Sequence, residues 1–127
     1  RVLALLPNAY MQGHTAGVHM AGGNEIFAKA IPMNSIGFFG LHIMTAGTYV
    51  GEMYEEKSDS TLKRLFTKDG LLKGFILIGK TERAGIYTSL IRERTPLDTI
   101  DFETMKKVAT SVAFSPENRR KKFGGVV

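Results

Sequence analysis

Residues 61–78, TLKRLFTKDGLLKGFILI, place two strand-like runs on either side of Asp69-Gly70. An Asp-Gly pair between β-rich segments is typical of a two-residue hairpin turn, because glycine accepts the left-handed backbone that such turns require. The second run, Leu71 to Ile78, is mostly apolar on both alternating faces, which predicts a central strand. The segment therefore predicts a β-hairpin within a mainly antiparallel sheet.

Further strands are expected before this hairpin. Residues 35–44, SIGFFGLHIM, are β-rich and apolar on both alternating faces, which predicts one covered strand. Gly47 marks the turn after it, and Thr48 to Glu56 is expected to be the next strand. The acidic end of that strand, Glu55-Glu56, is interpreted as solvated. A polar turn at residues 57–60 then leads into the hairpin.

A helix is expected after the hairpin, over residues 82–93, with Thr81 as its N-cap. Its apolar stripe consists of Ala84, Ile86, Tyr87, Leu90 and Ile91. Pro96 ends this helix. Helices that follow a run of strands predict the α+β class, here a three- to four-stranded, mainly antiparallel sheet with helices packed on it.

A second, shorter helix is expected to start at Thr99 or Asp101, with Phe102, Met105 and either Val108 or Ala109 facing inward. The residues from Ser115 onward are expected to form a mobile terminus. Their basic run, Arg119-Arg120-Lys121-Lys122, carries most of the net charge of +5. We interpret it as a solvated tail, and nucleic acid is not an expected partner, although a nucleic-acid module that uses this tail is a rival hypothesis.

The N-terminal part of the chain predicts a helix over residues 8–21. Pro7 suits a first helical turn, and Gly22-Gly23 ends the helix. One face is made almost wholly of small residues, Ala9, Gly13, Ala16, Gly17 and Ala21. Such a face predicts that another segment approaches the helix closely.

Charge is distributed unevenly, and this asymmetry predicts a missing neighbour. Residues 2–51 contain only Glu25 and Lys29 as formal charges. A domain of 127 residues cannot bury so long a stretch within itself, because too much of its area is surface. We therefore expect part of this stretch to cover something outside the chain, as in a truncated protein.

Several classes of chemistry are excluded or disfavoured. The chain contains no cysteine, so thiol chemistry is excluded within it. The three histidines, His14, His19 and His42, do not form a ligand pair on one face, and no metal site is expected. Neither a membrane span nor a signal peptide is apparent, which favours a cytoplasmic protein. No catalytic residue is assigned.

Residues 6–22, LPNAYMQGHTAGVHMAG, carry a family resemblance. They resemble the helix that closes the FAD domain in the pyridine-nucleotide-disulfide oxidoreductase superfamily, where a pattern like P-N-A-x-x-Q-G-x-x-A-x-x-x-x-A-G follows the last flavin-binding strand. The resemblance implies that the start of the helix, Leu6, Pro7, Asn8 and Ala9, lies against the flavin. Unsatisfied N–H groups and the positive end of the helix dipole can stabilise negative charge on a reduced flavin.

Residues 73–92, KGFILIGKTERAGIYTSLIR, followed by Thr95-Pro96-Leu97, carry a second resemblance. They are similar to the C-terminal domain of the rubredoxin-reductase and nitrite-reductase-like branch, where a strand of the K-G-x-I-L-I-G type leads into an R-A-G-I-Y helix. The two resemblances together cover about residues 3–108, in the family's order. The His-Pro-Thr segment of the glutathione-reductase-like branch has no counterpart here, which disfavours a dithiol reductase.

The resemblance implies three parts. Residues 1–28 would be the C-terminal remnant of a truncated FAD-binding domain, residues 29–114 an α+β C-terminal interface domain, and residues 115–127 a flexible basic tail. The full-length enzyme would use FAD and NAD(P)H to pass electrons to an acceptor. This chain alone is expected to bind neither cofactor and to be inactive.

The expected partners are the FAD and NAD domains of the same parent polypeptide. A homodimer surface and a docking face for an electron-acceptor protein remain open. The main rival hypothesis is a noncatalytic α+β domain that dimerises through its apolar strand. Phe38 and Phe39 are expected in the strand core rather than near the flavin.

Overall fold

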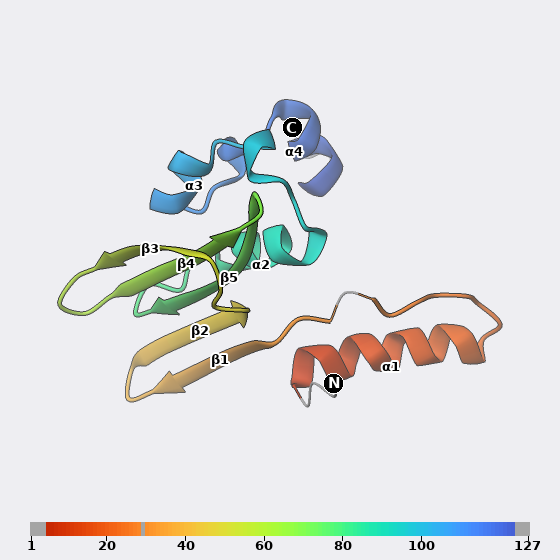
Figure 1. Ribbon diagram of the computed structural model, residues 1–127. Helices are drawn as coiled ribbons and strands as arrows, with labels where there is room; N and C mark the ends of the chain where they lie inside the picture. The colour runs from red at the N-terminus through yellow and green to blue at the C-terminus, as the bar shows by residue number, and fades with distance from the viewer. Residues whose placement is uncertain (1–4, 29, 124–127) are drawn as a thin grey trace.

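The computed structural model describes residues 5–28 and 30–123 of the chain (Figure 1). The elements in chain order are α1 (Leu6–Met20), β1 (Met33–Phe38), β2 (Leu41–Gly47), β3 (Glu52–Lys57), β4 (Leu62–Lys68), β5 (Leu71–Ile78), α2 (Ala84–Glu93), η1 (Leu97–Thr99), α3 (Phe102–Lys107), η2 (Ser111–Ala113) and α4 (Pro116–Phe123). The predicted α+β class is confirmed, and the sheet has five strands where three or four were expected.

The sheet is antiparallel throughout, with the strand order β1-β2-β5-β4-β3. The Asp69-Gly70 hairpin is confirmed, because β4 pairs with β5 and both turn residues have positive φ, 55° and 68°. This is the backbone of a type I′ turn. The prediction that Leu71–Ile78 is a central strand is also confirmed, since β5 lies between β2 and β4.

The extra strand comes from residues 35–44, for which the single covered strand was a wrong prediction. The structure divides this stretch into β1 and β2, which pair with each other across Phe39 and Gly40. Both turn residues are left-handed, with φ of 45° and 80°. Gly40 permits a tight hairpin turn inside a run that is apolar throughout.

The core lies on one face of the sheet, beneath α2 and α3. Its buried side chains are Ala46, Leu65, Leu72, Phe75, Leu77, Ala84, Tyr87, Leu90, Met105, Ala109, Ala113 and Phe114. The ring of Phe75 packs on Tyr87 with 5.7 Å between centroids. The predicted stripe of α2 is confirmed, because Ala84, Tyr87 and Leu90 are buried while Ile86 and Ile91 pack against the core.

The predicted N-terminal cap is found for α3 but not for α2. Asp101 caps α3, since its carboxylate accepts from the Thr104 hydroxyl at 2.6 Å and from the Thr104 amide at 3.0 Å, and these hydrogen bonds lower the pKa of Asp101. For α2, the predicted Thr81 cap is wrong. Arg83 occupies the cap position in a left-handed conformation without a side-chain hydrogen bond, and the helix begins at Ala84.

The opposite face of the sheet has no helix packed on it among the described elements (Figure 1). The strand register places a row of apolar side chains there: Ile36, Phe38, Leu41, Ile43, Met53, Leu62, Phe66, Ile76 and Ile78. Phe38 is 63% exposed and Met53 is 52% exposed. We call this surface the open face.

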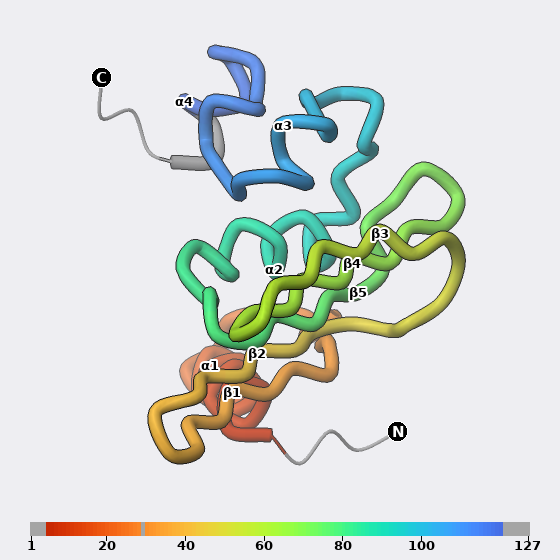
Figure 2. The backbone as a smooth tube through the Cα atoms, turned by 90° about the vertical axis from the view of Figure 1, so that its left-hand side faces the viewer, coloured from red at the N-terminus to blue at the C-terminus, as the bar shows by residue number. Residues whose placement is uncertain are grey.

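The first and the last described helices lie on opposite sides of the sheet. Helix α1 is at the β1–β2 end, and α3 and α4 are at the other, as both views show (Figures 1 and 2). Helix α1 runs from Leu6, two residues before the predicted start. Residues 116–123 of the expected tail form α4, and residues 124–127 lie outside the described part. The predicted mobility of this tail stays a prediction.

Tyr87 joins α2 to α3 and gives a testable pH dependence. Its hydroxyl donates to the Met105 carbonyl at 2.7 Å, and burial, with smaller effects of Glu56 and Tyr54, raises the pKa of Tyr87 to about 12. We expect Tyr87→Phe to lower the free energy of unfolding by about 1–3 kcal/mol at pH 7, because a buried carbonyl loses its donor. Urea unfolding measures this change.

The sign of the pH effect follows from the raised pKa. The contribution of the neutral hydroxyl is fully present below pH 10 and is lost as the pH rises towards 12, because the unfolded tyrosine ionises first. Wild-type stability should therefore fall by up to about 3 kcal/mol relative to Tyr87→Phe over this interval. Parallel pH profiles of the two proteins would contradict this assignment.

Candidate functional site

Among the described residues, the start of α1, which the resemblance places against a flavin, has no side-chain cap. Leu5 occupies the N-cap position with extended backbone and makes no side-chain cap, and the first turn contains no acidic residue. Leu6 is 85% exposed, and Pro7 and Ala9 are also exposed. N–H groups of a first helical turn have no partner within the helix. Pro7 has no N–H, the Ala9 N–H donates to the Leu5 carbonyl at 2.9 Å, and Asn8 is buried, so the exposed backbone donor of this turn is that of Leu6. This donor and the positive end of the helix dipole are suited to an anion.

Asn8 differs from its three neighbours because its side chain is completely buried. Its Nδ2 donates to the Ile31 carbonyl at 2.9 Å and so ties α1 to the segment before β1. Its Oδ1 has no hydrogen-bond partner among the described residues. A buried acceptor without a donor is costly, so this oxygen fits a donor supplied from outside the described part. The sequence predicted that Asn8 contacts the flavin, but it did not predict this hydrogen bond to Ile31.

The small-residue face of α1 is empty in the structure. A Cβ added at Gly13 or Gly17 would meet nothing within 4 Å. Ala9, Ala16 and Ala21 are likewise exposed. The described part of the chain therefore does not supply the neighbour that this face predicts.

The turn of the β1–β2 hairpin carries two aromatic side chains. Phe38 and Phe39 pack edge to face with 4.5 Å between ring centroids, and Phe39 is 94% exposed. The expectation that they belong to the strand core is wrong. Both rings lie at the short turn, away from the helix-covered face, and the side chain of Phe38 is part of the open face described above.

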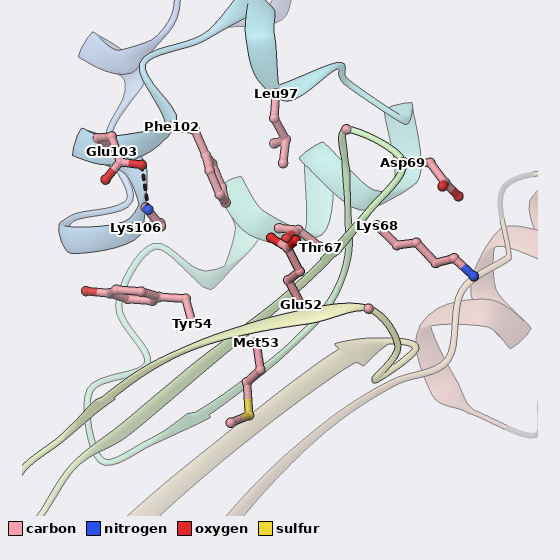
Figure 3. A pocket seen from close by; sticks show the side chains of 12 residues that line it. Glu52, Met53, Tyr54, Thr67, Lys68, Asp69, Leu97, Phe102, Glu103 and Lys106 are labelled. Carbon is pink, nitrogen blue, oxygen red and sulfur yellow. Dashed lines mark ion pairs between the residues drawn. The ribbon is translucent and has the colours of Figure 1, made fainter.

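A groove of about 740 Å³ lies at the other end of the molecule, between β3 and α3 (Figure 3). Glu52 and Tyr54 enter it from β3, while Leu97 and Phe102 enter from the opposite side. We call it the β3 groove. Sequence reasoning missed it, because its two walls are separated by more than forty residues and no local pattern joins them.

The acidic end of β3 is solvated, as expected. Glu55 pairs with Arg64, and Glu56 pairs with Lys63 at 3.0 Å, both across the β3–β4 ladder. The histidines are exposed as well. His14 lies 3.5 Å from Glu25, and the His19 ring contacts the Glu25 carbonyl at 2.6 Å. Over the described residues, no group of three or more potential metal ligands comes together.

Among the described helices, none has the length and apolar character needed to cross a membrane. No family model matches the chain. The chain is similar to the NADH-dependent phenylglyoxylate dehydrogenase subunit epsilon of Aromatoleum evansii, with 37% identity over 103 residues. The match covers 74% of this chain and 24% of the relative, so the chain spans about a quarter of that protein's length. The chain is thus related to a subunit of an NADH-dependent oxidoreductase.

Proposed function

We propose that this chain is the C-terminal part of an FAD-dependent NAD(P)H oxidoreductase. In this proposal, residues 1–28 close the FAD domain, residues 29–114 form an interface domain, and residues 115–127 form a basic tail. The observation that carries the proposal is the open start of α1 beside an empty small-residue face. The similarity to a subunit of an NADH-dependent enzyme supports the oxidoreductase context.

The residues at the start of α1 fit a flavin through their backbone. FAD would supply the electron transfer from NAD(P)H to the acceptor. The Leu6 N–H and the positive end of the helix dipole would stabilise negative charge at the pyrimidine edge of the ring, while exposed Leu6 and Ala9 flank it. Asn8 would position this tip through its bond to Ile31. No side chain of the chain is assigned a catalytic role.

The uncharged surface at the β1–β2 end would pack on the rest of the parent protein. The open face and Phe39 leave several large apolar side chains exposed, among them Phe38 and Met53, and exposed apolar patches often mark interaction sites. We infer that the FAD and NAD domains of the parent polypeptide cover part of this surface, and that the separate chain binds neither cofactor and is inactive. The proposal places this enzyme in the cytoplasm.

A noncatalytic dimerisation domain is the second candidate, favoured by a separate observation. Strand β1 is an edge strand without a single charged residue, and five of its six residues are exposed. Edge strands of monomers are usually protected by charge or proline. Flavin content of the parent protein decides between the candidates: a flavin-free parent that dimerises through β1 would support the dimerisation domain.

A charge introduced at the helix tip tests the flavin contact. We expect Ala9→Asp in the full-length parent to reduce FAD occupancy about tenfold, because a carboxylate beside the pyrimidine edge opposes its negative charge. Occupancy is measured as flavin absorbance per protein after purification. Asn24→Asp adds the same charge beyond the end of α1 and should leave occupancy unchanged. Equal occupancy in both variants would contradict the contact.

A further inference from the structure

We propose that the β3 groove binds an extended basic peptide segment, which adds as a sixth strand to the free edge of β3. This inference concerns a surface that the flavin proposal does not use. The groove combines an edge strand, an opposite wall that includes the apolar side chains of Leu97 and Phe102, and the carboxylate of Glu52, which points into it (Figure 3). Each of the three features contributes a different part of the recognition.

The edge strand supplies the backbone contacts. β3 ends the strand order and pairs only with β4. An antiparallel strand paired on one side directs its remaining N–H and C=O groups outward, where they can bond another strand. Peptides bind in this way where a groove runs beside an exposed strand edge, and alternate side chains then provide the specificity.

The opposite wall of the groove is held in place by three contacts to α3 and its end. Lys63 donates to the carbonyls of Lys106 and Lys107, at 3.0 and 2.7 Å, and the Tyr87 hydroxyl donates to the Met105 carbonyl. These bonds fix α3 over the sheet. A groove with a fixed wall loses little conformational entropy on binding.

Alternate side chains of an added strand would enter the groove. Glu52 and Tyr54 are two residues apart and point to the same side of β3, towards Leu97 and Phe102 (Figure 3). Side chains of a neighbouring strand project from the same face every second residue. One such side chain would lie beside the rings of Tyr54 and Phe102, on the side away from the Lys106 ammonium, which lies over both rings at 5.4 and 5.8 Å from their centroids. This position favours an aromatic or aliphatic side chain.

The charge of the groove selects a basic segment. Glu52 points into the groove and has no hydrogen bond or ion pair with any described residue. On the opposite wall, Glu103 pairs with Lys106. Lys68 and Asp69 point away from Glu52 (Figure 3). A lysine or arginine two positions from the apolar side chain would supply the missing partner of Glu52.

A second copy of the chain is a poorer occupant of this edge. Strand β3 contains three glutamates and one lysine in six residues. Parallel in-register self-pairing would set its glutamates against one another, and symmetric antiparallel pairing would match only Glu52 with a cation, Lys57, leaving Glu55 and Glu56 opposite Tyr54 and Met53. Like charges directly opposite each other destabilise a strand pair. The charge pattern therefore favours a partner with lysine or arginine at alternate positions.

Titration with a synthetic peptide tests the proposal. The probe is acetyl-Gly-Lys-Thr-Arg-Val-Phe-Thr-Lys-Gly-amide, whose basic and aromatic side chains alternate with uncharged ones. We expect saturable binding to the whole chain, with NMR shifts confined to the amides of β3 and α3. Glu52→Gln should weaken binding about five- to tenfold, because a charge-assisted contact is lost. Phe102→Ala should weaken it to a similar extent.

Matched controls separate the proposed mode from nonspecific attraction. Glu117→Gln removes the same charge from exposed α4 and should leave affinity unchanged. The same probe methylated at alternate backbone nitrogens should not bind, because strand addition requires those N–H groups. Binding of the methylated probe, equal affinity of Glu52→Gln, or shifts centred on β1 would each overturn the proposal. Absence of saturable binding at low salt would also overturn it, whatever the flavin content of the parent.

Discussion

We expect Phe75→Ala to lower the free energy of unfolding by about 3–5 kcal/mol, as truncation of a buried phenylalanine typically does. The side chain is 1% exposed, lies on the central strand β5 and packs on Tyr87. Its removal leaves a cavity between the sheet and α2. Domains of this size are stable by only about 5–15 kcal/mol, so the variant should lose a large part of its stability. Urea denaturation followed by circular dichroism measures the loss.

Phe39→Ala is the matched control, because it removes the same ring from a side chain that is 94% exposed. Its free energy of unfolding should change by less than about 0.5 kcal/mol. The same substitution should weaken assembly of the full-length parent if the β1–β2 hairpin packs on the flavin domain. A large loss for Phe39→Ala in the separate chain would show that the ring is buried there, contrary to the structure.

The sheet-and-helix core could be predicted because its signals are local. Asp69-Gly70 fixes one hairpin through backbone geometry, and Ala84, Tyr87 and Leu90 repeat at the spacing of a helix face. Asp101 caps α3 through contacts three residues away. Each of these features depends on residues that are close in sequence, so propensity and periodicity suffice to find them.

Residues 35–44 were harder to predict, because their apolar composition does not show where the chain turns. The run is typical of one covered strand, yet Gly40 permits a hairpin whose first strand is largely exposed. Absence of charge therefore predicts an interface, but it does not reveal the turn. The β3 groove was out of reach for another reason: Glu52 and Phe102 meet only once the whole sheet and the α2–α3 connection are in place.

The candidate flavin contact could be predicted from the sequence only in part. The motif placed Leu6 to Ala9 at the start of a helix, and the structure has the helix start at Leu6. The inward turn of Asn8 towards Ile31 depends on the path of the chain after α1, which no local pattern specifies. The sequence therefore located the start of α1. Which of its polar atoms are free to contact a ligand depends on the tertiary structure.

Gly74→Ala should be as damaging as the loss of a core ring, although it adds only a methyl group. Gly74 lies on β5 between Gly47 of β2 and Phe66 of β4. A Cβ there would collide with the Thr48 carbonyl oxygen and lie 2.9 Å from the Ala46 carbonyl oxygen. Backbone cannot move aside as a flexible side chain can, so β2 and β5 would have to separate. We expect a loss of about 3 kcal/mol in the free energy of unfolding, at the upper end of overpacking effects.

Gly37→Ala is the control for this backbone argument, since Gly37 also lies in a strand. Its added Cβ would make only ordinary contacts of 3.5 Å with the His42 ring. Alanine restricts the unfolded chain more than glycine, so Gly37→Ala should leave stability unchanged or raise it by up to about 1 kcal/mol. Opposite signs for the two substitutions, measured by thermal and urea unfolding, would show that close backbone approach makes Gly74 necessary. If both variants gained stability, the close packing of β2 on β5, which joins the exposed hairpin to the core, would be wrong.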